Sequence, residues 1–152
     1  MKINHKNRGF TIIEIIVLIC IISLVLGLTA PILRKTVERQ ALAAFSKQLA
    51  GDIRYVRQRN ISGEIYPPVV LQLRGDRYII KKGTVVLETK HAPQGIRFLD
   101  SFGSEIYFNE LGVPLGIGAT TIRLSDSYSH IYEVIITVNT GRVRTQPGTG
   151  KW

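Results

Sequence analysis

Residues 10–33 read FTIIEIIVLICIISLVLGLTAPIL, an apolar run of 24 residues in which Glu14 is the single charged side chain. A helix of this length extends about 36 Å, at roughly 1.5 Å per residue, and can cross the hydrocarbon core of a bilayer. A carboxylate within such a span is strongly unfavourable unless it is paired or neutralised. The run therefore predicts a membrane-spanning helix with a functional carboxylate that needs a cationic partner.

Basic residues flank this apolar run on both sides. Three of them lie within residues 1–9, which favours a cytoplasmic N-terminus, whereas Arg34 and Lys35 after the run reduce the charge difference. A secretory signal peptide is an alternative, but the run is long and residues 28–30 form a poor cleavage site. A plain signal anchor also fits the run, although it leaves Glu14 without a role.

The composition describes a small basic protein. Its 152 residues hold 20 Lys and Arg against 11 Asp and Glu, a net charge of +9. Residues 10–152 keep 17 basic against 11 acidic residues, a net charge of +6. This excess favours anionic partners such as lipid headgroups or nucleic acid, and a solvated basic surface is the alternative. The one cysteine, Cys20, lies in the apolar run, so the outer domain has no disulfide.

The helical pattern continues beyond Pro31, which is expected to kink or loosen the helix, to about residue 62. Apolar residues recur on one face at Val37, Ala41, Ala44, Phe45, Leu49, Ile53 and Val56. Basic residues mark the other face at Arg34, Lys35, Arg39, Lys47, Arg54, Arg57 and Arg59. This outer half is therefore predicted to be an amphipathic helix with a solvated basic face, a dedicated anion site being the alternative.

After Ser62-Gly63 the pattern changes to short β-branched and aromatic runs separated by glycine turns. We expect strands at Val69–Arg74, Arg77–Lys82, Thr84–Thr89, Ile96–Leu99, Glu105–Asn109, Thr120–Ser125, Ile131–Val138 and Arg142–Thr145. A long helix packed on an antiparallel β-sheet domain is an α+β fold. The predicted segments are 1–9, 10–33, the amphipathic outer helix 34–62, the β domain 63–145 and a mobile tail 146–152.

The segment Arg8-Gly9-Phe10-Thr11-Ile12-Ile13-Glu14 resembles the processing site of type IV pilins and of the pseudopilins of type II secretion and competence systems. The resemblance implies that residues 1–9 are a leader removed by a prepilin peptidase after Gly9. Phe10 would then be the N-methylated first residue of the mature chain. Proline is also frequent in such helices at the place of Pro31, so this residue is counted with the assembly residues.

The same resemblance implies a partner for Glu14. In this family the carboxylate meets the N-terminal amine of a neighbouring subunit, so that its charge is neutralised only at the correct axial offset. The alternatives are that Glu14 snorkels to the interface or is protonated. The implied protein is a non-enzymatic subunit, held as a single-pass protein in the cytoplasmic membrane with its outer domain beyond it, and then assembled with other subunits into a filament.

The outer region is similar to subunits of the GspH/FimT type, on the segments Phe45–Arg59, Ile106–Pro114 and Val134–Arg144. Some FimT-type minor pilins bind DNA through a similar glycine-arginine-x-arginine stretch. In a strand, Arg142 and Arg144 share one face, and Lys151 and Trp152 could add charge and a stacking surface. The alternative is an edge strand whose charges prevent aggregation.

No catalytic, cofactor or metal pattern stands out in the sequence. His5, His91 and His130 have no cysteine or carboxylate at metal-ligand spacing, so we expect surface histidines. Gly116-Ile117-Gly118 lacks the context of a nucleotide-binding loop and is expected to be a turn. Ser125, Asp126 and His130 lack the sequence context of a catalytic triad. We therefore expect neither an enzyme nor a bound cofactor.

Overall fold

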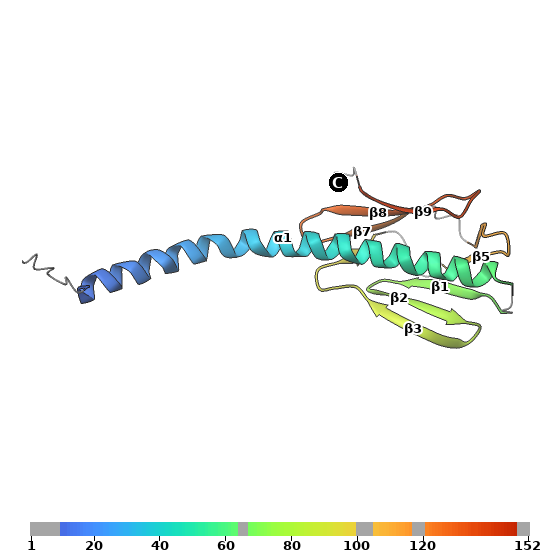
Figure 1. The fold of residues 1–152 in the computed structure, drawn as a ribbon, viewed down its shortest axis with the longest axis horizontal. Helices are drawn as coiled ribbons and strands as arrows, with labels where there is room; N and C mark the ends of the chain where they lie inside the picture. Colours follow the sequence, from blue (N-terminus) through green and yellow to red (C-terminus); the bar gives the residue numbers. More distant parts are fainter. Residues whose placement is uncertain (1–9, 64–66, 100–104, 117–120, 149–152) are drawn as a thin grey trace, which may run out of the picture. The chain divides into compact units, whose positions relative to one another are not determined.

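The computed structural model describes residues 10–63, 67–99, 105–116 and 121–148, and its fold is α+β (Figure 1). One long helix, α1 (Ile12–Ile61), is followed by antiparallel strands. This is the pilin-like arrangement that the sequence predicts. The chain divides into two compact units, Met1–Thr36 and Val37–Trp152, and α1 contributes to both.

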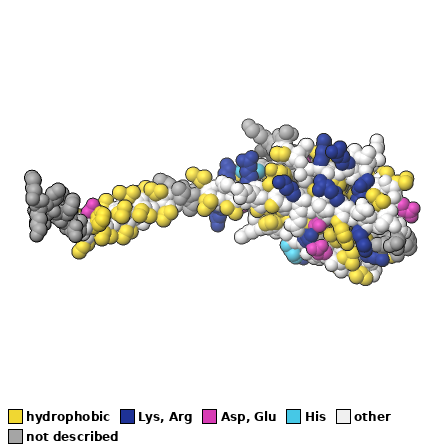
Figure 2. Space-filling view, viewed as in Figure 1, with side chains coloured by type: hydrophobic (Ala, Val, Ile, Leu, Met, Phe, Trp, Pro, Cys, Tyr) yellow, Lys and Arg dark blue, Asp and Glu magenta, His cyan; other side chains and the backbone are white. Residues whose placement is uncertain are grey.

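The N-terminal half of α1 is apolar and exposed. Its large aliphatic side chains from Ile12 to Leu26 are between 46% and 80% exposed, and Figure 2 shows apolar side chains covering this half of the helix. The helix is long and apolar enough to cross a membrane, with a mean hydropathy of 2.9 over its most apolar window. Helical structure continues through Pro31 without interruption, while the side chain of Pro31 lies outside the described part.

Side-chain hydrogen bonds fix both ends of α1. At the start, the Thr11 Oγ1 accepts a hydrogen bond of 3.3 Å from the Glu14 backbone N–H, so Thr11 acts as the N-cap residue. At the other end, the Asn60 amide both donates to the Val69 carbonyl and accepts from the Val69 N–H, each at 2.9 Å. This pair of bonds ties the last turn of the helix to the first strand.

The described strands form two antiparallel sheets. The first has the order β3 (Val85–His91), β2 (Arg77–Lys82), β1 (Val69–Arg74), β5 (Glu105–Phe108) and β6 (Pro114–Gly116). The second has the order β4 (Arg97–Phe98), β7 (Thr121–Ser125), β8 (Ile131–Ile136) and β9 (Val143–Pro147). Neighbouring strands pair in register through short turns, so most pairings join segments close in sequence.

Several strand ends shift by one or two residues from the sequence prediction, and the differences at β6 and β9 have a clear cause. Strand β6 is not predicted, because Pro114-Leu115-Gly116 has the composition of a turn; it pairs with β5 across the tight turn at residues 109–113. Strand β9 begins at Val143 and ends at Pro147, where the sequence predicts a strand from Arg142 to Thr145 and a tail from Gln146. Gln146 and Pro147 pair with β8, so the tail prediction is wrong for these two residues.

The core lies between the outer half of α1 and both sheets. The Phe45 ring packs against Tyr78 of the first sheet and Phe98 of the second, with centroids 5.8 and 6.0 Å apart. The predicted apolar face of the helix is wrong at Val37 and Ala44, which are exposed. A helix covered by two sheets buries a wider arc, and this arc includes residues that the narrow stripe omits: Leu42, Ser46, Ala50 and Asn60.

A polar cluster joins α1 to the first sheet. Asp52 of α1 accepts hydrogen bonds from the Tyr78 hydroxyl and from Lys90 Nζ, the latter at 2.8 and 3.0 Å. Burial and then the bond to Asp52 raise the pKa of Tyr78. Burial lowers the pKa of Lys90, but its bonds to Asp52 and Glu88 outweigh this and raise the pKa. The folded state thus favours a neutral phenol and a charged ammonium.

These two shifts predict a loss of stability in alkali. A raised native pKa contributes stability below the ordinary pKa values of 10.0 and 10.5, and this stability is lost as the pH rises beyond them. The free energy of unfolding should fall above about pH 10, by up to about 1.4 kcal/mol per pH unit for each group. Urea denaturation at a series of pH values measures this slope. The variant Asp52→Asn/Tyr78→Phe should flatten it, whereas Tyr107→Phe should not; an equal slope in all three would contradict the assignment.

Candidate functional site: the arginine-anchored turns

Two arginines of α1 hold the turns at the far end of the β domain. Arg57 donates from Nε to the Gly112 carbonyl and from Nη2 to the Thr140 carbonyl, both at 3.1 Å. Arg54 donates from Nη2 to the Val143 carbonyl at 2.9 Å. One helix face therefore anchors both the β5–β6 turn and the β8–β9 turn by charged donors to backbone acceptors.

The β5–β6 turn is built by Asn109. Its side-chain Oδ1 accepts from the N–H groups of Leu111 and Val113, at 3.1 and 2.8 Å, and this leaves the chain to reverse at Gly112 with φ of +74°. Glycine adopts such a φ without the steric cost that a side chain brings. Asn109 and Gly112 thus have a structural role, because together they present the Gly112 carbonyl to Arg57.

The β8–β9 turn depends on Gly141 in the same way. Gly141 has φ of +64°, and its N–H donates to the Thr137 carbonyl at 2.7 Å. A Cβ atom placed on Gly141 would lie 2.0 Å from the Gly112 carbonyl oxygen and 2.8 Å from Arg57 Nε. The two turns therefore touch at their glycines, and Arg57 lies against both of them.

A basic depression of about 390 Å³ lies beside these turns. Its lining residues are Arg54, Arg57, Thr140, Gly141, Arg142 and Val143, and Figure 2 shows Lys and Arg side chains gathered over the outer helix and the neighbouring β surface. Arg142 and Arg144 are exposed, and no hydrogen bond or ion pair engages either guanidinium within the described residues. Lys151 and Trp152 lie outside the described part of the chain.

The arrangement changes the interpretation of two helix arginines. The sequence places Arg54 and Arg57 on a solvated basic face, yet both are bound to backbone carbonyls and Arg57 is half-buried. Helical spacing gives no signal that separates Arg57 from the basic residues around it. The sequence signal for the anchoring role of Arg57 is the pair Gly112 and Gly141. A side chain at either position would occupy space that the Arg57 guanidinium fills.

The assembly residues predicted from the sequence lie at the start of α1. Phe10 is 79% exposed, and Gly9 lies outside the described residues. Glu14 is exposed and pairs with no cation in the described part of the chain. Glu14 also stands three residues after the N-cap Thr11, which is the spacing of a capping box. A carboxylate at this position interacts favourably with the positive end of the helix dipole. The sequence analysis missed this second role, although Thr11-x-x-Glu14 is its signal.

Ser125, Asp126 and His130 form a turn, not a triad. The buried Asp126 carboxylate accepts from the Tyr128 and His130 N–H groups at 2.9 and 2.8 Å, and its Oδ2 lies 2.7 Å from His130 Nδ1. Ser125 Oγ donates to the Asp126 carbonyl at 3.0 Å. The hydroxyl is therefore engaged by the backbone, and the carboxylate organises the β7–β8 connection.

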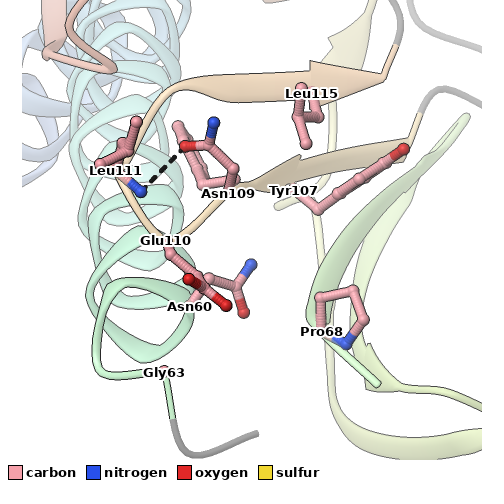
Figure 3. A pocket seen from close by; sticks show the side chains of 9 residues that line it. Asn60, Gly63, Pro68, Tyr107, Asn109, Glu110, Leu111 and Leu115 are labelled. Carbon is pink, nitrogen blue, oxygen red and sulfur yellow. Dashed lines mark hydrogen bonds between the residues drawn. The ribbon is translucent and has the colours of Figure 1, made fainter. Parts of the chain in front are cut away.

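A second hollow, of about 490 Å³, lies between the end of α1 and the β5–β6 hairpin (Figure 3). Pro68, Tyr107, Leu111 and Leu115 line its apolar walls. Its two asparagines are occupied internally, Asn60 by Val69 and Asn109 by the turn. Among the described residues that line it, only the exposed Glu110 carries a carboxylate, and these residues do not provide the converging polar groups of a catalytic or small-molecule site.

Among the described residues, no group of three His, Cys, Asp or Glu side chains could hold a metal ion. Comparison with known protein families, with curated proteins and with solved structures finds no match. The resemblance to pilins therefore rests on the sequence motifs and on the fold.

The contact between the two glycine turns predicts opposite effects of the same substitution at two positions. Gly141→Ala should destabilise the β domain by about 2 kcal/mol or more, because it combines a left-handed φ with a steric clash. Gly51→Ala is the matched control. Gly51 is an exposed helical glycine with open space around its Cβ position, so this change should stabilise by about 0.5–1 kcal/mol. Urea denaturation of a chain lacking residues 1–33 measures both, and equal stability of the two variants would contradict the contact.

Proposed function

We propose that this chain is a minor pilin or pseudopilin, a non-enzymatic subunit of a type IV pilus-like, type II secretion or competence filament. The observation that carries the proposal is the two-part character of α1. Its first half exposes mostly large aliphatic side chains, with Glu14 as its one carboxylate among the described residues, while its outer half is the central element of the β domain core. A helix of this kind needs a bilayer or other helices around its first half.

The apolar half has two environments in this proposal. Exposing a contiguous apolar surface of this size to water is unfavourable, so such a surface indicates contact with a membrane or with another protein. Before assembly it would span the cytoplasmic membrane once, with residues 1–9 on the cytoplasmic side and the β domain beyond the opposite face. After a prepilin peptidase cuts at Gly9, the Phe10–Leu33 segments of neighbouring subunits would pack together in the filament.

Glu14 is the residue on which the assembly step depends. Cleavage before Phe10 creates a cationic amine, and a neighbour's amine would neutralise the Glu14 carboxylate within the apolar core. The capping box offers a different reason for a glutamate here, since it stabilises the helix start within one chain. Glutamine fits a capping box equally well but carries no charge, so it separates the two roles.

The proposal predicts an order among variants of Glu14 in a host that carries the peptidase. Glu14→Val and Glu14→Gln should both be processed to Phe10 but excluded from filaments, and Glu14→Asp should assemble in part because it keeps the charge. Intact mass determines processing and methylation, and immunoblotting of sheared filaments measures assembly. Thr11→Val is the control, which removes the cap and keeps the charge. Normal incorporation of Glu14→Gln would restrict Glu14 to capping, and a chain that retains Met1–Gly9 would contradict the proposal as a whole.

A second candidate is a DNA-binding minor pilin of a DNA-uptake filament. The observation in its favour is that Arg142 and Arg144 are exposed with free guanidinium groups, beside a basic depression, on a chain with a net charge of +9. Guanidinium groups bind phosphate oxygens well, and such contacts carry little sequence information. The competing explanation is that these charges protect β9, which is the edge strand of its sheet.

The DNA candidate is tested by the salt dependence of binding to a chain that lacks residues 1–33. The logarithm of affinity should fall with the logarithm of salt concentration by about 0.9 per phosphate contacted, so Arg142→Ala/Arg144→Ala should flatten the slope by about two units. The charge control is Arg74→Ala/Arg97→Ala, on β1 and β4. Removing Lys151 and Trp152 should have a smaller effect, mainly on single strands.

Arg54 and Arg57 are unsuitable as charge controls, because their loss would also release the turn that carries Arg142. An equal loss in the two double variants would indicate diffuse attraction to a basic surface. Absence of binding at low ionic strength would contradict the DNA candidate and would leave prevention of edge-to-edge association as the role of Arg142 and Arg144.

A further inference from the structure

Strand β3 is an edge strand with an unusual surface. It forms one end of the first sheet, so part of its N–H and C=O groups point outward without strand partners. Val85, Val86 and Leu87 are consecutive, and they are 61%, 56% and 50% exposed. Val85 and Val86 pair with Lys82 and Lys81 and so point to opposite faces, while Leu87 is the extra residue where the register shifts. Strand β3 is therefore apolar on both sides of its edge. Figure 2 shows apolar side chains along the border of the domain where Figure 1 draws β3.

The other end strands of the two sheets are protected against pairing. Strand β9 has the exposed Arg144 in its middle and Pro147 at its end, and β6 has three residues beginning with Pro114. Strand β4 has only two residues. Charges, proline and short length are the usual means by which proteins prevent edge-to-edge association. Among the described strands, β3 is thus the one long edge, of seven residues, whose apolar half carries neither a charge nor a proline; its one irregularity is the bulge at Leu87.

The apolar surface continues onto the helix. Asp52 of α1 binds Lys90 of β3, so this stripe of α1 faces the β3 side of the sheet. Tyr55 lies three residues further along the same stripe and is 48% exposed. A strand added next to β3 would therefore extend the α1-facing side of the sheet, which holds Val85, toward the Tyr55 ring, and it would bury Val86 on the opposite side.

The charges around β3 select among partners. Lys81 pairs with Glu105 and Lys90 pairs with Asp52, whereas Lys82, which lies directly across from Val85, has no ion pair with any described residue. The whole chain is also strongly basic, at +9, so two copies repel each other. A pair of β3 strands related by a two-fold axis would also point the outer halves of the two α1 helices in opposite directions. Two chains anchored side by side in one membrane, as proposed above, would need these helices to point in the same direction.

We infer that β3 is a docking edge for an extended strand of a different, acidic protein chain. The partner strand would add to the sheet by backbone hydrogen bonds, place β-branched or other apolar side chains against Val86 and Leu87, and direct a carboxylate to Lys82. This surface lies within Val37–Trp152 and is independent of the proposed membrane segment.

The test uses the full-length chain in neutral detergent micelles and two fluorescein-labelled peptides, EETVTVTEE and KKTVTVTKK. At low salt, fluorescence anisotropy should show the acidic peptide binding at least ten times more tightly than the basic one. Val86→Thr/Leu87→Thr should weaken binding of the acidic peptide at least ten-fold, since it removes apolar contact but keeps β-branched residues that favour a strand. Val138→Thr, at an equally exposed valine in the other sheet's turn, should leave it unchanged.

A charge reversal makes the test independent of strand stability. Lys82→Glu should weaken the acidic peptide and strengthen the basic one, with thermal unfolding unchanged. Equal binding of the two peptides to the wild-type chain, or unchanged binding to the double-threonine variant, would overturn the inference. A full-length chain whose self-association is abolished by that variant would identify a second copy as the occupant and would also overturn it.

Discussion

The whole chain is organised by one constraint, which is that a single helix must satisfy two different environments. The first half of α1 has apolar side chains on every side, so no orientation on a soluble domain could bury them all. The outer half has a wide buried arc because two sheets pack on it, and Phe45 contacts an aromatic ring of each sheet. The β domain is therefore built around a helix whose other half lies outside its core.

This constraint explains why charged hydrogen bonds, and not apolar packing alone, fix the far end of the domain. A helix held only by aliphatic side chains could slide along a sheet with little change in buried area. The bonds from Arg57 to Gly112 and Thr140, and from Lys90 to Asp52, have defined lengths and partners at different levels of the helix. The segments Phe45–Arg59, Ile106–Pro114 and Val134–Arg144 contribute the residues that meet at Arg57. Their glycines and arginines thus have a packing role that does not depend on any ligand.

The sequence predicts the parts of this fold that depend on local pattern, and it misses those that depend on distant contacts. The helix and the first hairpins follow from hydrophobic period and from turns such as Gly75-Asp76, where neighbours in sequence are neighbours in space. The exposure of Ala44 and the anchoring role of Arg57 depend on segments up to 83 residues away. Strand β6 is an exception: its hairpin with β5 is local, and it is missed because Pro114-Leu115-Gly116 has the composition of a turn. Among the site residues, the sequence identifies Arg142 and Arg144 by composition, but it cannot show that Arg54 and Arg57 share their surroundings.

Glu14 illustrates how a local and an intermolecular role can reinforce each other. Glu14 is the third residue of α1 and lies in its first turn, where a carboxylate interacts favourably with the positive end of the helix dipole. In a hydrocarbon environment this local compensation is incomplete, because the dipole supplies only about half an elementary charge. A full cation from a neighbouring chain would supply the remainder, and it can do so at one axial offset only. The first-turn position therefore compensates part of the carboxylate's charge within one chain, and in the proposed assembly a neighbour's amine would compensate the rest.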